Sequence, residues 1–219
     1  MHGLLNLAVA PLLALGSEYY LFGAAGLVSI VAFAGLILAP ALLVEAFLQW
    51  RADPHRRLRA GWLAVGGAGI GFWIYLALNQ VVYGDLLAFT DIQRGHWGKE
   101  LKLPWEGIAS VLGWFRSDDP DAVFMNGGME LLFIAMGLLA TVATAIWLRP
   151  TWAVWMAGNW LLITSTGFVL SVPHYALVLF PLFAWFAVLP DRWRWGVAAV
   201  SIVALAYFAA RFAAGQWAF

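Results

Sequence analysis

The sequence predicts an all-α fold, a polytopic transmembrane helical bundle of about seven spans with one helical extracytoplasmic segment. Composition carries much of this prediction, because 63% of the 219 residues are hydrophobic and 11% are charged, whereas soluble domains carry about 25% charged residues. Uncharged stretches also exceed the roughly 20 residues that a helix needs to cross a bilayer. We therefore expect an integral, multi-pass membrane protein with membrane lipids as partners, and treat residues 1–219 as one membrane domain.

The N-terminal half contains apolar regions that a basic loop interrupts. Residues 4–15 and 19–50 are largely apolar, and the loop at 51–59 then brings four arginines. Residues 61–83 carry no charge and predict a clear span. The glycine cluster in this span follows no predicted strand, which favours close helix packing over a phosphate-binding loop.

The C-terminal half predicts four further spans. Residues 131–148 are long enough for one span, and residues 151–190 are long enough for two, with a turn at Ser171–Pro173. Residues 195–210 form the last predicted span. Short turns that contain arginine separate these regions and mark the membrane boundaries between them.

The segment from Gly84 to Met125 is the polar centre of the chain and holds 11 of its 24 charged side chains. Its residues 105–115 alternate bulky apolar and small side chains, a pattern that predicts a short helix lying in the membrane interface. Because the rest of the chain is apolar, we expect this segment (84–125) to form the main water-facing surface. Function is expected there, together with membrane residues that open onto the same side.

The distribution of arginines predicts which side of the membrane this segment faces. The loops at 51–59, 149–150 and 191–194 hold seven arginines, and short loops rich in Lys and Arg tend to stay in the cytoplasm. Alternating spans place all three loops on one side. The segment 84–125 then lies outside the cytoplasm, and so does the turn at 171–174.

Composition also narrows the function classes. The formal net charge is zero, which gives no reason to expect a nucleic-acid partner. The chain has no cysteine, which excludes disulfides, thiolate metal sites and a cysteine nucleophile. Asp91 and His96 supply only two ligands, too few to predict a metal site.

Three stretches of the chain follow the pattern of a known family, in the family's order. They are GLILAPALLVEAF at 35–47, GDLLAF at 84–89 with Gln93, Trp97 and Pro104-Trp105 after it, and SVPHYALVLFPLF at 171–183. This arrangement resembles the bacterial PIG-V-like proteins, which are relatives of the second GPI mannosyltransferase. The resemblance covers roughly residues 25–190.

The resemblance implies a multi-span glycosyltransferase of the GT-C type in the bacterial cytoplasmic (inner) membrane. Such an enzyme transfers a sugar, here expected to be mannose-like, from a polyprenyl-phosphate donor on the extracytoplasmic side. The lipid-phosphate sugar is then a substrate, and no separate cofactor and no metal are implied.

The chain departs from the family at two points. His174 stands where the family usually has arginine. The family's presumed catalytic aspartate lies in a tryptophan–aspartate context after its first span, and this chain has no such motif. The chain therefore resembles the C-terminal portion of the family's fold, and we expect either a missing N-terminal half or a partner subunit.

Glycosyl transfer needs a carboxylate that takes a proton from the acceptor hydroxyl, and Asp91 and Asp85 are the catalytic candidates. Asp91 has the better position for a base, although a solvated helix face also explains it. Asp85 begins the polar segment, where capping of the helix predicted over 86–93 is the alternative. His174 is the first candidate for contacting the donor phosphate, because it opens a span at the outer boundary. A hydrogen bond to neighbouring backbone is its alternative.

The remaining candidates for substrate binding are Arg94, Gln93, Trp97, Glu130 and Tyr175. Arg94 belongs to a basic stripe with Lys99 and Lys102, which either holds a phosphate or faces headgroups and solvent. Gln93 and Trp97 are four residues apart on one predicted helix face, which lines a sugar groove or simply packs. Glu130 is an ionisable group at the mouth of a span or a helix-start carboxylate favoured by the dipole. Tyr175 lies in the histidine-bearing stretch.

Two other functions fit the same residues. The chain can be a non-catalytic membrane subunit, or a remnant, that keeps a lipid-binding groove but lacks the base. It can also be a small-solute transporter. Most of the predicted spans carry no ionisable residue inside the bilayer, which disfavours a transport path.

Overall fold

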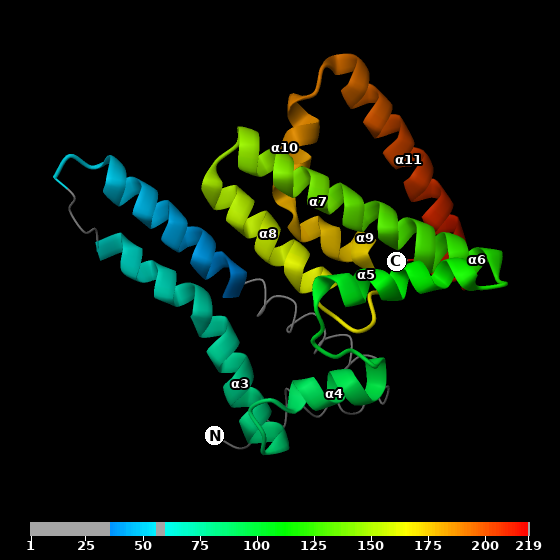
Figure 1. Cartoon of the computed structure of the whole chain (residues 1–219), viewed down its shortest axis with the longest axis horizontal. Helices are drawn as coiled ribbons and strands as arrows, with labels where there is room; N and C mark the ends of the chain where they lie inside the picture. Colours follow the sequence, from blue (N-terminus) through cyan, green and yellow to red (C-terminus); the bar gives the residue numbers. More distant parts are fainter. Residues whose placement is uncertain (1–35, 56–59, 219) are drawn as a thin grey trace.

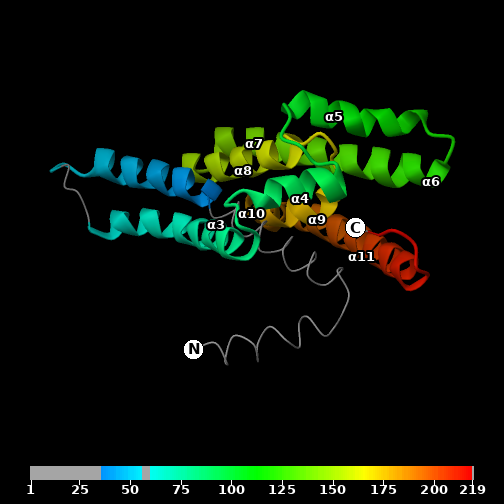
Figure 2. The ribbon, with the colours of Figure 1, turned by 90° about the horizontal axis from the view of Figure 1, so that it is seen from below.

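The computed structural model describes residues 36–55 and 60–218. Within these ranges the chain is helical, and its one β-type contact is an isolated antiparallel bridge between Leu101 and Thr166. The predicted all-α class is therefore confirmed. Figures 1 and 2 show a central pair of helices with shorter helices around one of its ends.

The N-terminal part of the described chain is a helical hairpin. A helix over 36–52 runs beside η1 (Ala60–Gly69) and α3 (Ile70–Tyr83) in both views (Figures 1 and 2). The Trp62 indole N–H donates to the Gln49 side-chain oxygen at 3.4 Å, which joins the two arms. Gly84 ends α3 in the left-handed conformation, with φ of 75°.

The centre of the molecule is an antiparallel pair, α7 (Glu130–Trp147) and α8 (Pro150–Thr164). α7 continues α6 (Pro120–Ala122) and the π-helical turn η3 (Val123–Met129). Together they form one helix of 28 residues. α8 packs closely on the helix over 36–52, because a Cβ added to Gly158 would lie 2.5 Å from Ile37 Cγ2.

The C-terminal helices follow α8 through an irregular stretch. The chain forms α9 (Val172–Tyr175), η4 (Ala176–Val178) and α10 (Phe180–Val188), and α9 and α10 pack against α7. Figure 1 shows the chain leaving the bundle along α10, and α11 (Asp191–Ala213) running back from the far end of α10 to α6. There the Arg211 guanidinium donates to both Asp121 carboxylate oxygens at 2.7 Å.

The core lies where α7 meets α8 and the C-terminal helices. Indole N–H groups help to fix these contacts, since Trp160 donates to the Ile134 carbonyl at 2.9 Å and Trp155 to the Val178 carbonyl at 2.8 Å. Two clusters of buried apolar residues surround them: Ala140, Met156, Ala176, Leu179 and Leu182 form one, and Val111, Ile134, Val169 and Val172 form the other.

The polar segment folds as α4 (Ala88–Trp97), α5 (Pro104–Gly113) and the short turn η2 (Trp114–Arg116). The helix predicted over 105–115 is thus present as α5 and η2. α5 packs against α7 and α8. Only a glycine fits at position 107, because an added Cβ would lie 2.0 Å from the Thr164 carbonyl oxygen.

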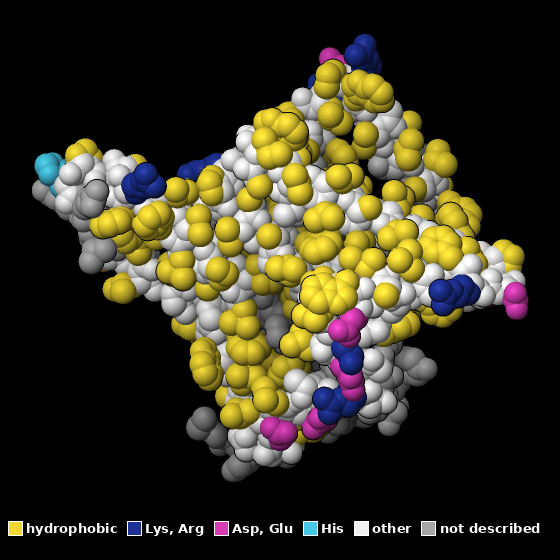
Figure 3. Space-filling model, viewed as in Figure 1, with side chains coloured by type: hydrophobic (Ala, Val, Ile, Leu, Met, Phe, Trp, Pro, Cys, Tyr) yellow, Lys and Arg dark blue, Asp and Glu magenta, His cyan; other side chains and the backbone are white. Residues whose placement is uncertain are grey.

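Three of the described helices are long and apolar enough to cross a membrane, namely Ala60–Tyr83, Pro120–Trp147 and Asp191–Ala213. This finding is consistent with a membrane protein. Hydrophobic side chains are spread over the face in Figure 3, and many large ones are exposed on α3 and α11.

The predicted count of about seven spans is not supported. The region 151–190, in which two spans were expected, forms α8 of 15 residues and then breaks into three short pieces. Pro173 and Pro181 lie in the first turns of α9 and α10, where a missing amide hydrogen costs no helical bond, so each marks the start of a new helix. The span predicted over 4–15 and the first part of 19–50 lie outside the described residues.

Candidate functional site

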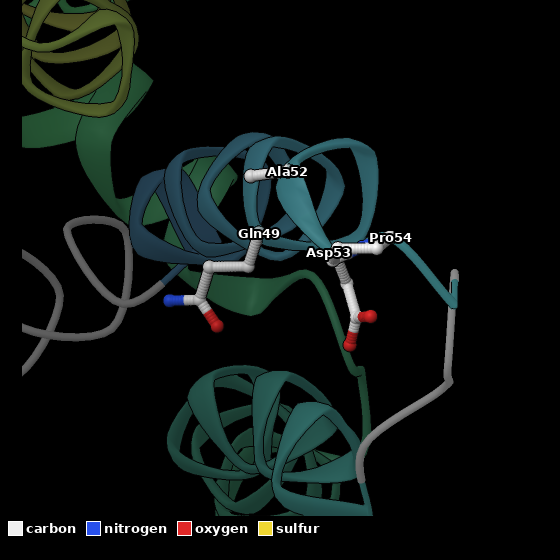
Figure 4. Close-up of a pocket in the computed structure, with 4 residues that line it drawn as sticks. All are labelled: Gln49, Ala52, Asp53 and Pro54. Carbon is white, nitrogen blue, oxygen red and sulfur yellow. The ribbon is translucent and has the colours of Figure 1, made fainter.

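A hollow at the end of the N-terminal helix is not the candidate site. Gln49, Ala52, Asp53 and Pro54 line it (Figure 4). The Gln49 amide and the Asp53 carboxylate point to the same side in Figure 4. Both already have hydrogen-bond partners, since Gln49 bonds to Glu45 and Trp62, and Asp53 accepts from the His55 amide at 2.8 Å.

Glu130 is the most informative polar side chain of the described chain. It is 0% exposed, and its two carboxylate oxygens accept the backbone amides of Ser171 at 2.6 Å and Val172 at 2.7 Å. A buried carboxylate is costly unless hydrogen bonds satisfy it, and charge-assisted bonds of this kind are strong. Glu130 therefore fastens the start of α9 to the start of α7.

The alternative of a helix-start carboxylate describes Glu130 only in part, because α7 begins at this residue but continues η3 without a break. The residue lies inside a continuous helix, after the π-helical turn η3. One extra residue in a turn rotates the following side chains by about 100° relative to the preceding ones. η3 thus helps to direct Glu130 towards α9, and the helix end that it caps is that of α9.

The backbone after α4 brings Lys99 to the same place. Gly98 ends α4 in the left-handed conformation with φ of 59°, and the Lys99 amide then bonds to the Gln93 carbonyl at 3.0 Å. This glycine cap turns the chain back. Residues 100–102 then run beside residues 165–167. The Lys102 amide donates to the Ser165 backbone carbonyl at 3.1 Å, and the Gly167 amide donates to the Glu100 backbone carbonyl at 2.8 Å.

The Lys99 ammonium lies over the ring of Tyr175, with Nζ 5.4 Å from the ring centroid. Burial lowers the pKa of Lys99 from its ordinary value, and the nearby Glu130 carboxylate opposes this shift. The exposed His174 ring packs edge-on against Tyr175, with 5.8 Å between the ring centroids. We call Lys99, Glu130, His174 and Tyr175 the Tyr175 cluster.

The structure places Asp91 and Arg94 on an exposed charged strip beside this cluster. Arg94 Nε lies 3.1 Å from a Glu100 oxygen and its NH1 lies 3.9 Å from Asp91, while Lys102 Nζ lies 3.7 Å from Glu100. Figure 3 shows a strip of alternating acidic and basic side chains next to hydrophobic ones. Ion pairs this exposed contribute little stability.

The other predicted residues are arranged locally. The Asp85 carboxylate accepts the Leu87 amide at 2.8 Å in the turn before α4. The N-cap of α4 is Leu87, without a side-chain cap bond, so the prediction that Asp85 caps this helix is wrong. Gln93 is partly buried on α4, and its carbonyl accepts the Lys99 amide. The side chain of Trp97 lies outside the described part of the structure, so the predicted face of Gln93 and Trp97 is not tested.

Lys99 was expected only as one member of the basic stripe, and its contacts with Tyr175 and Glu130 were not predicted. In the sequence it stands among other charges and is indistinguishable from the exposed basic stripe. The glycine before it is the available signal, because a glycine after a helical stretch predicts a left-handed cap and a reversal of the chain. The contact with Tyr175 is not visible in the sequence at all.

The Tyr175 cluster can bind an anion. Lys99 supplies a cation and donor, and the Tyr175 hydroxyl and the His174 imidazole supply further donors. Among the described residues there is no group of three His, Asp or Glu side chains that could hold a metal ion.

Comparison with known proteins identifies no relative of this chain. No protein-family model matches it, and no curated protein or solved structure matches it either. The functional argument therefore rests on the residues themselves.

Proposed function

We propose that this chain binds a polyprenyl-phosphate sugar at the extracytoplasmic boundary of the bacterial inner membrane, as part of a mannosyltransferase-like glycosyltransferase of the GT-C type. The observation that carries the proposal is the convergence of Lys99 and His174 on the ring of Tyr175. These groups come from the polar segment and from the histidine-bearing turn, which hold two of the three stretches that resemble the PIG-V-like family.

The location of the cluster suits a phosphate carried by a lipid. Apolar helices surround the bundle, and α7, at whose start the cluster lies, belongs to one of the three candidate spans. A polyprenyl chain would lie along this apolar surface while its phosphate reaches the cations. The low polarity near Lys99 would strengthen its attraction for a phosphate, because Coulomb interactions weaken in water.

In this proposal the chain's own residues handle the leaving group. Lys99 and His174 offset the charge that collects on the phosphate as the sugar departs, which is electrostatic stabilisation of the transition state. The Tyr175 hydroxyl orients the phosphate. Asp91, on the strip beside the cluster, is the base candidate that takes the acceptor proton, with Asp85 the second.

A specific observation favours the alternative of a non-catalytic lipid-binding subunit. Asp85 is held by the Leu87 amide, and Asp91 lies beside Arg94 on an exposed strip. Neither carboxylate contacts the Tyr175 cluster in the described structure. In this alternative the cluster still binds the lipid phosphate, while another polypeptide provides the base.

The first test measures binding of polyprenyl-phosphate-mannose to the full chain in lipid nanodiscs. Lys99→Ala and His174→Ala should each weaken binding roughly tenfold, because each removes a charge-assisted hydrogen bond to the phosphate. Lys102→Ala is the matched control, since Lys102 is the chain's only other lysine and pairs with Glu100. Wild-type protein that shows no saturable binding would disprove the proposal.

A second measurement separates enzyme from subunit. Sugar transfer from the same donor to a lipid or glycan acceptor is measured for wild type and for Asp91→Asn. The enzyme proposal predicts transfer by wild type and a loss of at least a hundredfold in the variant, the typical contribution of general base catalysis. Binding without transfer supports the subunit alternative.

A further inference from the structure

We infer that Glu130 is a positioning residue, whose carboxylate holds the turn from Ser171 to Tyr175 in the conformation that presents Tyr175 and His174 beside Lys99. This replaces the sequence prediction that Glu130 itself contacts the substrate. The inference rests on the proposed function only where it concerns binding of the lipid phosphate. The part that concerns the conformation of the turn depends on the geometry of the turn alone.

Glu130 has no free surface with which to meet a ligand. The side chain is 0% exposed, and each carboxylate oxygen accepts one backbone amide, at 2.6 and 2.7 Å. A buried carboxylate that lost these donors would be left without hydrogen-bond partners, at a cost larger than the gain from one new contact. Its described partners are in the turn, so its effect on a ligand passes through the turn.

The turn needs such a support because of Ser171. This residue has φ of 66°, and it is the one described residue other than glycine with a positive φ. The left-handed conformation places the Cβ of an L-residue too close to backbone oxygen. Two charge-assisted hydrogen bonds from adjacent amides to one carboxylate offset this strain and select the conformation.

The same turn determines where Tyr175 lies. The Tyr175 amide donates to the Ser171 carbonyl at 3.1 Å, which closes one turn of helix from the strained residue to the tyrosine. Tyr175 then lies under Lys99. A change at Ser171 would therefore move the ring that Lys99 and His174 both contact.

The experiment uses the fact that Lys99 and Lys102 are the only lysines. Reductive methylation with ¹³C-formaldehyde keeps their charge and gives each lysine an NMR signal in the full chain. The Tyr175 ring should displace the Lys99 methyl signal, whereas the Lys102 signal serves as an internal control. Affinity for polyprenyl-phosphate-mannose, expressed per folded molecule, is the second readout.

Glu130→Gln should remove most of the ring-induced displacement of the Lys99 signal and weaken binding roughly tenfold, because an amide NH₂ cannot accept the second backbone amide. Adding Ser171→Gly to this variant should restore both readouts, because glycine adopts positive φ without strain. If Glu130→Gln fails to fold, Glu130→Asp replaces it in the experiment. Aspartate keeps the charge but is too short to reach both amides, so the same loss of both readouts is expected.

Unchanged Lys99 signal and affinity in folded Glu130→Gln or Glu130→Asp would overturn the inference. A loss that Ser171→Gly does not rescue would also overturn it, since that result means Glu130 acts directly on the ligand or only on global stability. If wild type binds no lipid phosphate, the proposed function fails. The Lys99 signal and its rescue then still decide whether Glu130 positions the turn.

Discussion

At the scale of single residues, Lys99 links the polar segment to the histidine-bearing turn. It lies outside the three candidate spans, yet it is partly buried over Tyr175. Burial disfavours its charged form, while the carboxylate of Glu130 favours it. The first effect is the larger, so the folded-state pKa lies below the ordinary value.

This shift predicts the pH dependence of amine labelling. Mass spectrometry in detergent micelles can follow how the labelling of Lys99 depends on pH. The midpoint should lie below the ordinary lysine pKa of about 10.5. Between the two pKa values the unfolded chain binds more protons, so the free energy of unfolding should rise with pH in that window. The urea-denatured chain is the control. A native midpoint at or above the denatured one would contradict the account.

Glu130 shows what sequence reasoning about one residue can and cannot provide. Its place at the start of an apolar helix marks it as unusual, because carboxylates are rare in such helices unless they are paired. Its partners are backbone amides 41 and 42 residues away in sequence. Backbone amides occur at nearly every residue, so no sequence pattern can reveal this contact.

At the scale of helices, the close contact of α5 with α8 places the polar segment on the bundle. Gly107 makes this contact possible, since a Cβ there would lie 2.0 Å from the Thr164 carbonyl and 2.9 Å from the Thr166 carbonyl. Both neighbours are backbone atoms and cannot move aside separately. The stretch 165–167 that pairs with residues 100–102 directly follows this contact.

Gly107→Ala should therefore destabilise the protein by about 1–3 kcal/mol, the usual cost of overpacking. Gly113→Ala is a matched control at the other end of α5, where an added Cβ meets nothing within 4 Å. The control should be neutral or stabilising by up to about 1 kcal/mol, because alanine has the higher helix propensity. Thermal unfolding in detergent measures both variants. Equal stability of the two would show that α5 is not held by this contact.

The helix count illustrates a limit of sequence reasoning at the same scale. The apolar composition of residues 151–190 correctly predicts helices, but the length of this region does not show where the helices break. The stretch 165–171 is not helical. Ser165 and Gly167 pair with the polar segment, and the Ser171 amide donates to the Glu130 carboxylate. These tertiary contacts override a local preference for helix. The region predicted to form two spans therefore forms α8 and three shorter helices.

At the scale of the whole molecule, polar contacts gather at two ends of the bundle. At one end the Glu45 carboxylate accepts Arg149 at 2.7 Å and Thr151 at 2.6 Å. At the other end lies the Tyr175 cluster. α8 connects the two, and its 15 residues span about 22 Å at 1.5 Å per residue.

This arrangement agrees with part of the organisation predicted from the sequence. Apolar composition predicted a helical protein, and the polar segment does meet the turn that carries His174, through the bridge of Leu101 with Thr166 and the contact of Lys99 with Tyr175. Charge bias alone predicted that these stretches face outwards, and that sidedness stays a prediction. Side-chain pairing at the site could not be predicted, because it depends on the turns at Gly98 and Ser171.

The measurement that tests the central claim most directly is cross-linking from outside intact cells. The native chain has no cysteine, so Lys99→Cys/His174→Cys contains one reactive pair. A membrane-impermeant bis-maleimide added outside should join the two peptides. Lys99→Cys/Arg149→Cys, whose positions lie at opposite ends of α8, should give no such link. A Lys99–His174 pair that reacts only after the membrane is permeabilised, or never cross-links, would contradict a shared extracytoplasmic donor site.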